Sequence, residues 1–222
     1  MTAYPKRIWL VRHAITTAPN VLNGSESNVT LSELGHHQAG ALAGWFKGLA
    51  PEVVYSSTMT RAIQTAQPIA AMCGIPHHIA EDLHERRIGA LSGQEFSLNV
   101  GPWADTLNAW GEGNTAYTTP GAESYDDLVA RLLPAWNRVM QQTAGKRVVI
   151  VVHGIVVKVL LLTLLANHGP KKWPTLGRVQ NVGVTEMLHT GSDLRANSLL
   201  YVPEAIRNLY VLEHEPVRHS VG

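Results

Sequence analysis

Short apolar runs alternate with longer amphipathic stretches along most of the chain. Short runs rich in β-branched residues and bounded by polar residues are typical of buried strands, and apolar residues three or four apart favour helices. The runs that predict strands are 7–11, 53–55, 75–79, 148–152, 182–188 and 198–202. The stretches that predict helices are about 30–49, 59–72, 124–143 and 155–166. Residues 81–121 are irregular, and we expect loops and short helices there.

Local signals indicate where several of these helices begin and end. Thr30 is followed three residues later by Glu33, which predicts a capping box and a helix beginning at Thr30. Ser124, in the sequence S-Y-D-D, predicts another helix start. Pro68 lies within the second helical stretch and predicts a kink or an early end.

Residues 148–166 form the longest apolar run, and its length approaches that of a membrane span. The run is interrupted by His153, Gly154 and Lys158, and it changes from β-branched to leucine-rich residues. A buried strand, a tight turn and a buried helix explain this pattern better than a membrane span does.

Strands and helices alternate along the chain, which predicts an α/β fold. We expect a three-layer sandwich in which a mostly parallel central sheet has helices on both faces, with an irregular or helical cap insert at about 86–121. The last two strands are expected to be antiparallel neighbours. Residues 1–222 are interpreted as one domain that includes this insert.

Composition excludes several classes of protein. Hydrophobic residues make up 45% of the 222 residues and the formal net charge is +1, so the chain can bury a core and is expected to bind neither nucleic acid nor membrane. Cys73 is the single cysteine, which excludes an internal disulfide and fits a reducing, cytoplasmic location. We expect Cys73 to be an inert buried thiol, and the pairs His36-His37 and His77-His78 to lie on the surface.

Polar residues follow several of the predicted strands. Arg12-His13 ends the first strand, His153 follows the fourth, and Arg61 lies in the first turn of a helix that Ser57 or Thr58 is expected to cap. The carboxyl ends of parallel strands meet at one edge of a sheet, where active sites of such folds lie. Two guanidinium groups, two imidazoles and a helix N-terminus would suit a phosphoryl group.

Four segments carry a resemblance to a known family. They are L-V-R-H at 10–13, the stretch 55–66, the stretch 83–93 and V-V-H-G at 151–154. Together, and in this order, they resemble the histidine phosphatase superfamily, also called the phosphoglycerate-mutase-like superfamily. The phosphatase branch is the better match.

This resemblance implies a reaction that proceeds through a phosphohistidine and uses no metal or cofactor. His13 would attack phosphorus and become phosphorylated. Arg12, Arg61 and His153 would bind the phosphoryl oxygens and stabilise the charge of the transition state. Glu85 would protonate the leaving oxygen and then activate the water that frees the enzyme.

The resemblance also implies residues that bind phosphate or substrate. These are Thr16, Asn20, Asn23, Gly24, Arg86 and Gly154. The sequence departs from the family pattern at Ala14, where glycine is usual, and at Ile15, where an acidic residue or glutamine is usual. The extra methyl group of Ala14 would crowd or shift His13, and Ile15 would alter substrate choice.

The reaction class has three alternatives. The segment between Glu85 and His153 is shorter than in the cofactor-dependent glycolytic mutases, and a mutase must keep water away from its phosphohistidine. We therefore expect a phosphate monoester hydrolase that acts on a small phosphorylated metabolite. A phosphoglycerate mutase and a silent phosphate-binding relative are the alternatives. The sequence leaves the leaving group open. It also leaves open the oligomeric state, for which a homodimer is one option. Trp103, Trp110 and Trp136 either belong to the core or form a wall of the substrate pocket.

Overall fold

The computed structural model describes residues 5–95, 100–190 and 193–211. Its strands are β1 (Arg7–Arg12), β2 (Val53–Ser56), β3 (His77–Ile79), β4 (Arg147–Val152), β5 (Val184–Thr190) and β6 (Asp193–Tyr201). Its helices are α1 (Glu33–Leu49), α2 (Thr60–Cys73), α3 (Pro102–Glu112), α4 (Tyr125–Gln142), α5 (Gly154–Leu164) and α6 (Glu204–Val211). Short 3-10 helices lie at Glu81–Leu83, Gly89–Leu91 and Pro170–Lys172.

The strands form one sheet in the order β3-β2-β4-β1-β5-β6. The four strands from β3 to β1 are parallel to one another, whereas β5 pairs antiparallel with both β1 and β6. The prediction of a mostly parallel sheet that ends in two antiparallel neighbours is confirmed. The register places Arg12, at the end of β1, opposite Val152, at the end of β4.

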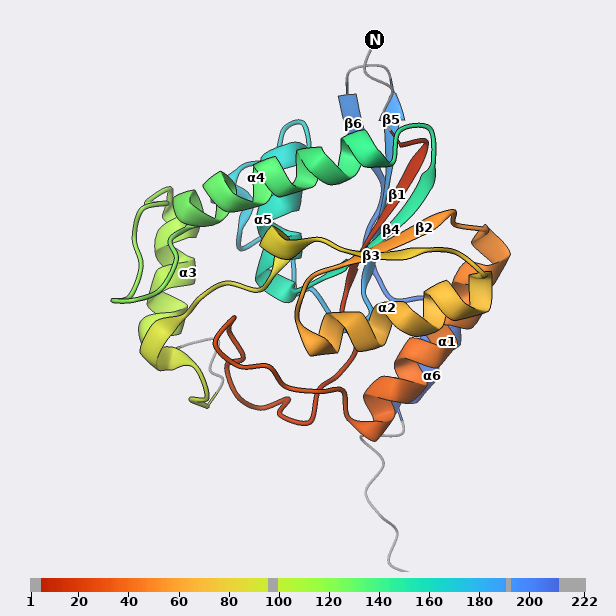
Figure 1. The fold of residues 1–222 in the computed structure, drawn as a ribbon. Coiled ribbons are helices and arrows are strands. Elements are labelled where there is room, and N and C mark those ends of the chain that lie inside the picture. Colours follow the sequence, from red (N-terminus) through yellow and green to blue (C-terminus); the bar gives the residue numbers. More distant parts are fainter. Residues whose placement is uncertain (1–4, 96–99, 191–192, 212–222) are drawn as a thin grey trace, which may run out of the picture.

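The sheet separates two hydrophobic cores, because alternate side chains of a strand point to opposite faces. Ile8 and Leu10 of β1 pack with α4 and α5, while Trp9 and Val11 pack with α1, α2 and α6. Figure 1 shows these two groups of helices on opposite sides of the sheet. The predicted three-layer α/β sandwich is therefore confirmed.

The start of α1 differs from the prediction. Ser32 is the N-cap, and its hydroxyl accepts a hydrogen bond from Gly35 N–H, so the capping box expected at Thr30 is wrong. The carbonyl of Thr30 instead accepts a bond from Thr17 N–H, and Leu31 forms a β-bridge with Thr16. Residues 30 and 31 are therefore held in an extended conformation, and the helix begins after them. The helix start predicted at Ser124 is confirmed, and Ser124 forms a capping box with Asp127.

The second helix also differs from the prediction. Met59 is the N-cap of α2, so neither Ser57 nor Thr58 caps it. The helix continues through Pro68 and ends at Gly74, whose φ of 65° lies in the left-handed region that glycine favours. An early end at Pro68 is therefore wrong.

Two features near the ends of helices were not foreseen. Cys73, at the end of α2, is half-buried, so the prediction of a buried thiol is wrong; its partial burial still raises the pKa of the thiol. The helix α6 packs Ile206 into the core beside α1, and no helix is predicted from the sequence after Glu204. The two histidine pairs lie at the surface, with His36, His37 and His78 exposed and His77 half-buried.

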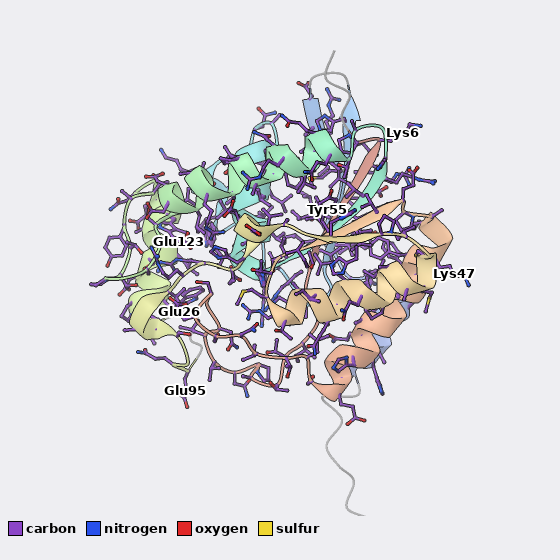
Figure 2. All side chains as sticks on the ribbon, in the orientation of Figure 1. Lys6, Glu26, Lys47, Tyr55, Glu95 and Glu123 are labelled. Atoms are coloured by element: carbon purple, nitrogen blue, oxygen red, sulfur yellow. The ribbon has the colours of Figure 1, made fainter. Side chains whose placement is uncertain are left out.

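The cap insert expected at 86–121 contains the 3-10 helix at Gly89–Leu91 and α3. Leu22, in the loop that follows β1, packs against Ile88, Leu91 and Trp103 of this segment. Figure 1 shows that loop and α3 on the same side of the molecule, and in Figure 2 Glu26 and Glu123 lie on that side as well.

Trp110, Trp136 and the apolar run at 148–166 lie in the interior. Trp110 and Trp136 belong to the hydrophobic core on the α4 and α5 face. The run forms β4 and α5, as expected. Among the described residues, no helix combines the length and apolar character needed to cross a membrane.

Candidate active site

The carboxyl ends of β1 and β4 bring His13 and His153 together. These strands are parallel neighbours, and each histidine follows directly after its strand. His13 N–H donates to the carbonyl of Val152 at 2.9 Å, and the two imidazole rings have centroids 5.2 Å apart. Both rings are buried.

The hydrogen bond of His13 fixes which ring nitrogen is free to react. Its Nδ1 lies 2.7 Å from the carbonyl oxygen of Ala14. A carbonyl only accepts hydrogen bonds, so Nδ1 carries the proton and Nε2 keeps its lone pair. Burial, together with the charges of Arg61 and Arg12, holds the pKa of His13 well below its usual value. The imidazole is therefore neutral near pH 7, as a nucleophile requires.

His153 is oriented by Ser57, whose predicted role from the sequence was only that of a helix cap. Ser57 Oγ lies 2.6 Å from His153 Nε2 and accepts a hydrogen bond from Met59 N–H at 3.3 Å. Within the described residues, the buried Nδ1 of His153 has no hydrogen-bond partner. Burial and the charges of Arg61, His13 and Arg12 hold the pKa of His153 well below its usual value.

Arg61 is almost completely buried and is tied to the loop after β1. Its Nη1 donates to the carbonyl of Ser27 at 2.8 Å, and its Nη2 donates to the carbonyls of Asn23 at 3.2 Å and Gly24 at 3.4 Å. Its Nε has no partner among the described residues. Burial, opposed by the charge of Glu85, lowers the pKa of Arg61 to about 10, so the side chain stays charged at neutral pH.

Gly24 has no room for a side chain. A Cβ at this position would lie 2.3 Å from the carboxylate of Glu26 and 2.5 Å from the side chain of Ile88. Glu26 in turn accepts hydrogen bonds from the N–H groups of Ile88 and Gly89. The loop after β1 is thereby joined to the insert.

Arg12 and His13 are held by a segment from the far end of the sequence, residues 179–183. Arg12 Nη1 donates to the carbonyl of Val179 at 2.7 Å, and Asn181 Nδ2 donates to the carbonyl of His13 at 3.0 Å. Val182 has a φ of 49°, an outlier for a β-branched residue, and its N–H donates to the carbonyl of Arg12 at 3.0 Å. This contact was not predicted, because the apolar run at 182–188 predicts the start of a strand at Val182.

Glu85 lies beside the start of α5. One carboxylate oxygen accepts a hydrogen bond from Arg86 N–H at 2.8 Å, and the other accepts from Ile155 N–H at 3.4 Å. Gly154 precedes Ile155 and packs against the Arg12 guanidinium, since a Cβ on Gly154 would lie 3.5 Å from Arg12 Nε. The five residues expected to carry the chemistry therefore lie around the ends of β1 and β4.

Four other residues predicted to bind phosphate or substrate lie on the loop after β1 and at the start of the insert. Thr16 is buried beside Leu31, and Asn20 is exposed on the loop after β1. Asn23 Nδ2 donates to two carbonyls of its own loop. The Arg86 guanidinium is fully buried, with its centre 4.8 Å from the ring of Trp110.

Comparison with known proteins identifies the family of the chain. Residues 8–200 match the family model described as histidine phosphatase superfamily (branch 1). The chain belongs to the histidine phosphatase superfamily. The family expected from the sequence is therefore confirmed.

Relatives within the histidine phosphatase superfamily include phosphatases and a mutase. The chain is 34% identical over 163 residues to a metal-independent phosphoserine phosphatase of Arabidopsis thaliana, covering 71% of this chain and 68% of the relative. It is 28% identical over 206 residues to a 2,3-bisphosphoglycerate-dependent phosphoglycerate mutase of Beijerinckia indica, covering 86% and 96%. The solved structure of a mycobacterial glucosyl-3-phosphoglycerate phosphatase with inorganic phosphate is similar, with TM-score 0.76, 25% identity and coverage of 90% and 99%.

The two departures from the superfamily pattern are accommodated by backbone hydrogen bonds. Ala14 N–H donates to Thr65 Oγ1 at 3.0 Å, and the Ala14 methyl group packs into the core. Ile15 N–H donates to Gln38 Oε1 at 3.0 Å. Both residues are thus fixed through their main chain, and the ring of His13 remains beside that of His153.

Proposed function

We propose that this protein hydrolyses phosphate monoesters of small metabolites through a phosphohistidine formed on His13. The observation that carries this proposal is the hydrogen bond from His13 Nδ1 to the carbonyl of Ala14, which leaves Nε2 as the free nucleophile. Two buried donor positions, Arg61 Nε and His153 Nδ1, are without protein acceptors among the described residues and would bind phosphoryl oxygens.

In the first step, the lone pair of His13 Nε2 forms a bond to phosphorus while the bond to the ester oxygen breaks. Protonated Glu85 gives its proton to that oxygen, and the alcohol leaves. Arg12, Arg61 and His153 bind the three phosphoryl oxygens, whose negative charge is spread in the transition state. Their positive charge and hydrogen bonds stabilise this state among side chains that are mostly buried.

In the second step, water attacks the phosphorus of the phosphohistidine. The carboxylate of Glu85 accepts a proton from the water, the bond between phosphorus and Nε2 breaks, and its electron pair returns to the imidazole. Inorganic phosphate leaves, and Glu85 is again protonated for the next cycle. The reaction therefore needs no group beyond the side chains already present.

Relatives support hydrolysis and also keep a second candidate. A metal-independent phosphoserine phosphatase and a glucosyl-3-phosphoglycerate phosphatase are among the similar proteins, which supports a phosphatase that acts on a small metabolite. The similarity to a phosphoglycerate mutase over 96% of that relative favours phosphoryl transfer as the second candidate. The short segment between Glu85 and His153 argues for hydrolysis, because it gives less cover against water.

Several finer features remain predictions. Phosphate or substrate contacts are proposed for Thr16, Asn20, Asn23, Gly24, Arg86 and Gly154. A cytoplasmic location is proposed on the single cysteine. Independence of metals and cofactors, a homodimeric state and the division into one domain with a cap insert also remain predictions.

The test measures phosphate release from p-nitrophenyl phosphate and a panel of sugar phosphates, phosphoserine and phosphoglycerate. We expect turnover by the wild type, loss of turnover in His13→Ala and full activity in His36→Ala, whose histidine is exposed on α1. The wild type should also form a phosphoprotein that is labile in acid and stable in base. Full activity of His13→Ala would contradict the proposal, and phosphoglycerate isomerisation that needs a bisphosphate would establish the mutase instead.

A further inference from the structure

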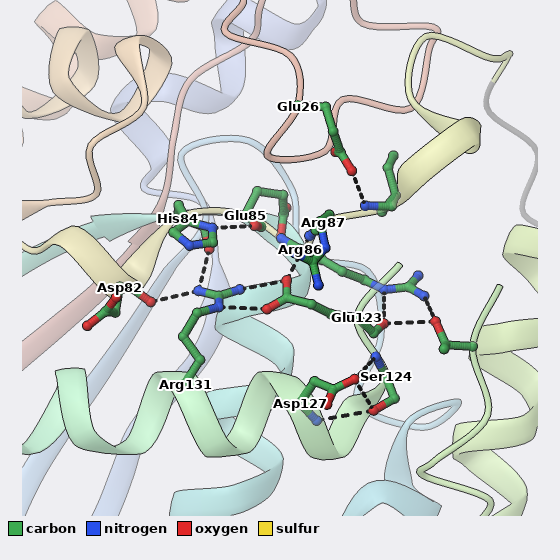
Figure 3. Close-up of polar contacts among 12 residues, drawn as sticks. Glu26, Asp82, His84, Glu85, Arg86, Arg87, Glu123, Ser124, Asp127 and Arg131 are labelled. Carbon is green, nitrogen blue, oxygen red and sulfur yellow. Dashed lines mark hydrogen bonds and ion pairs between the residues drawn. The ribbon is translucent and has the colours of Figure 1, made fainter. Parts of the chain in front are cut away.

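A buried ion pair between Glu123 and Arg131 holds the backbone on both sides of Glu85 (Figure 3). We infer that Glu123 and Arg131 are positioning residues, which place the Glu85 carboxyl group to protonate the leaving oxygen. This inference rests on the proposed function, in which Glu85 is the general acid. Neither residue has a part in the chemical steps described above.

Arg131 extends from α4 to the segment that precedes Glu85. Its Nη1 donates to the carbonyl of Asp82 at 2.7 Å and to that of His84 at 3.1 Å. A guanidinium group presents its donors in a rigid plane, so these bonds fix two carbonyls relative to α4. One of them belongs to the residue directly before Glu85.

Glu123 completes the arrangement on the other side of Glu85. Its two carboxylate oxygens accept hydrogen bonds from Arg131 Nε at 2.7 Å and Nη2 at 3.0 Å, in a bidentate pair. The Oε2 atom also accepts from Arg87 N–H at 2.7 Å, and the Glu123 carbonyl accepts from Arg86 Nε at 2.7 Å. The segment after Glu85 is therefore fixed to the same pair.

The charge state of Glu123 suits this role. Burial acts to raise the pKa of Glu123, but the hydrogen bonds from Arg131 and from Arg87 N–H outweigh it, so the pKa lies below its usual value. The carboxylate is ionised at neutral pH and can accept all three hydrogen bonds. Both side chains are mostly buried, with exposed fractions of 14% for Arg131 and 9% for Glu123.

Glu85 itself is held less firmly than its neighbours. Its carboxylate accepts a bond from Arg86 N–H at 2.8 Å and a long one from Ile155 N–H at 3.4 Å. The direction of its side chain therefore depends on the backbone of residues 82–87, which the ion pair fixes. A small displacement of a catalytic group costs much of its effect, because proton transfer needs close approach.

This role predicts an effect that depends on the leaving group. Phenolate is a more basic leaving group than p-nitrophenolate, so phenyl phosphate needs the proton from Glu85 more than p-nitrophenyl phosphate does. The two esters have almost the same shape. A substitution that only displaces Glu85 will therefore slow the hydrolysis of phenyl phosphate more than that of p-nitrophenyl phosphate. General damage to the site will slow the hydrolysis of both esters equally.

The experiment measures kcat/KM of Glu123→Gln for both esters, since this constant reports the step in which the ester bond breaks. We expect a loss of about tenfold for phenyl phosphate and less than about threefold for p-nitrophenyl phosphate. Arg131→Lys keeps the charge but not the planar fork, and it should show the same selectivity if Glu123→Gln does not fold. In a Glu85→Gln background, adding Glu123→Gln should not change the ratio of kcat/KM between the two esters any further.

Asp127→Ala serves as the matched control, because Asp127 caps α4 beside Ser124 without contacting the ion pair. It should lower the midpoint of thermal unfolding and leave the ratio of kcat/KM for the two esters unchanged. Equal losses for both esters in Glu123→Gln and Arg131→Lys would overturn the inference, as would no loss in either. A wild type that hydrolyses neither ester would instead refute the proposed function.

Discussion

The ends of β1 and β4 and the segment around Glu85 supply the two halves of the site, and they are built differently. His13 and His153 each follow directly after a strand, and the parallel ladder fixes their separation. Glu85 lies in an irregular segment between two 3-10 helices, where no ladder positions it. Side chains of Glu123 and Arg131 supply the missing constraints there.

This difference separates what each half controls. In the proposed mechanism, groups at the strand ends bind the phosphoryl group, which is the same in every phosphate ester, so a defect there should slow the hydrolysis of all substrates. Glu85 would act on the leaving oxygen, whose alcohol or phenol differs between substrates. The pattern of activity across leaving groups therefore tells which half a variant has disturbed.

The largest effect is expected from Arg61→Met, at the strand ends. It removes a buried guanidinium that has no acceptor for its Nε among the described residues. We expect kcat/KM to fall by about 10²-fold or more, and equally for phenyl and p-nitrophenyl phosphate. Inhibition by inorganic phosphate should weaken in parallel. If Arg61→Met lowers kcat/KM for phenyl phosphate alone, the two halves of the site do not have separate roles.

The second effect concerns stability in acid. The folded-state pKa values of His13 and His153 lie below the unfolded value of about 6.5. The unfolded chain therefore binds more protons as pH falls below about 6.5, and the free energy of unfolding should fall by up to about 1.4 kcal/mol per pH unit for each histidine. Denaturant unfolding between pH 7.5 and 5.5 checks this. The slope of the free energy of unfolding against pH should decrease in His13→Gln and stay unchanged in His36→Gln.

A smaller effect should come from Ser57→Ala, which removes the hydrogen bond to His153 Nε2. We expect kcat to fall by about tenfold, because His153 loses the contact that orients its ring. Ser56→Ala is the matched control, because the Oγ of this adjacent buried serine contacts His77 Nε2 and the carbonyl of Ser57 rather than His153. The loss of this hydroxyl should change kcat by less than about twofold. Equal effects of the two substitutions would show that the orientation of His153 does not matter.

The smallest effect is expected from Arg138→Gln, which breaks the exposed ion pair with Asp82. Exposed pairs contribute less than about 1 kcal/mol to stability, so thermal and denaturant midpoints should change little. Arg131→Gln should cost about 3 kcal/mol or more, because it leaves the buried carboxylate of Glu123 unpaired. If Arg138→Gln and Arg131→Gln lower the free energy of unfolding by similar amounts, burial of the pair between Arg131 and Glu123 does not affect its contribution to stability.

Much of the fold could be predicted from the sequence. Strands such as 148–152 are continuous β-branched runs, and helices such as 124–143 have a clear apolar stripe, so local composition identifies them. Predictions failed where a distant contact decided a boundary. Thr30 looked like a cap, yet its backbone pairs with the loop after β1, and α1 begins later. The helix α6 has a strong apolar stripe but was missed, because its partner is the surface of α1.

The sequence by itself determined which residue types follow which strands, because hydrophobic pattern and residue order are local properties of the chain. That was enough to expect Arg12, His13 and His153 at one edge of a sheet. Only the tertiary structure decided which nitrogen of His13 is free, that Ser57 contacts His153, and that Glu123 and Arg131 hold the segment of Glu85. Each of these depends on the direction and separation of two groups in space, which no local pattern encodes.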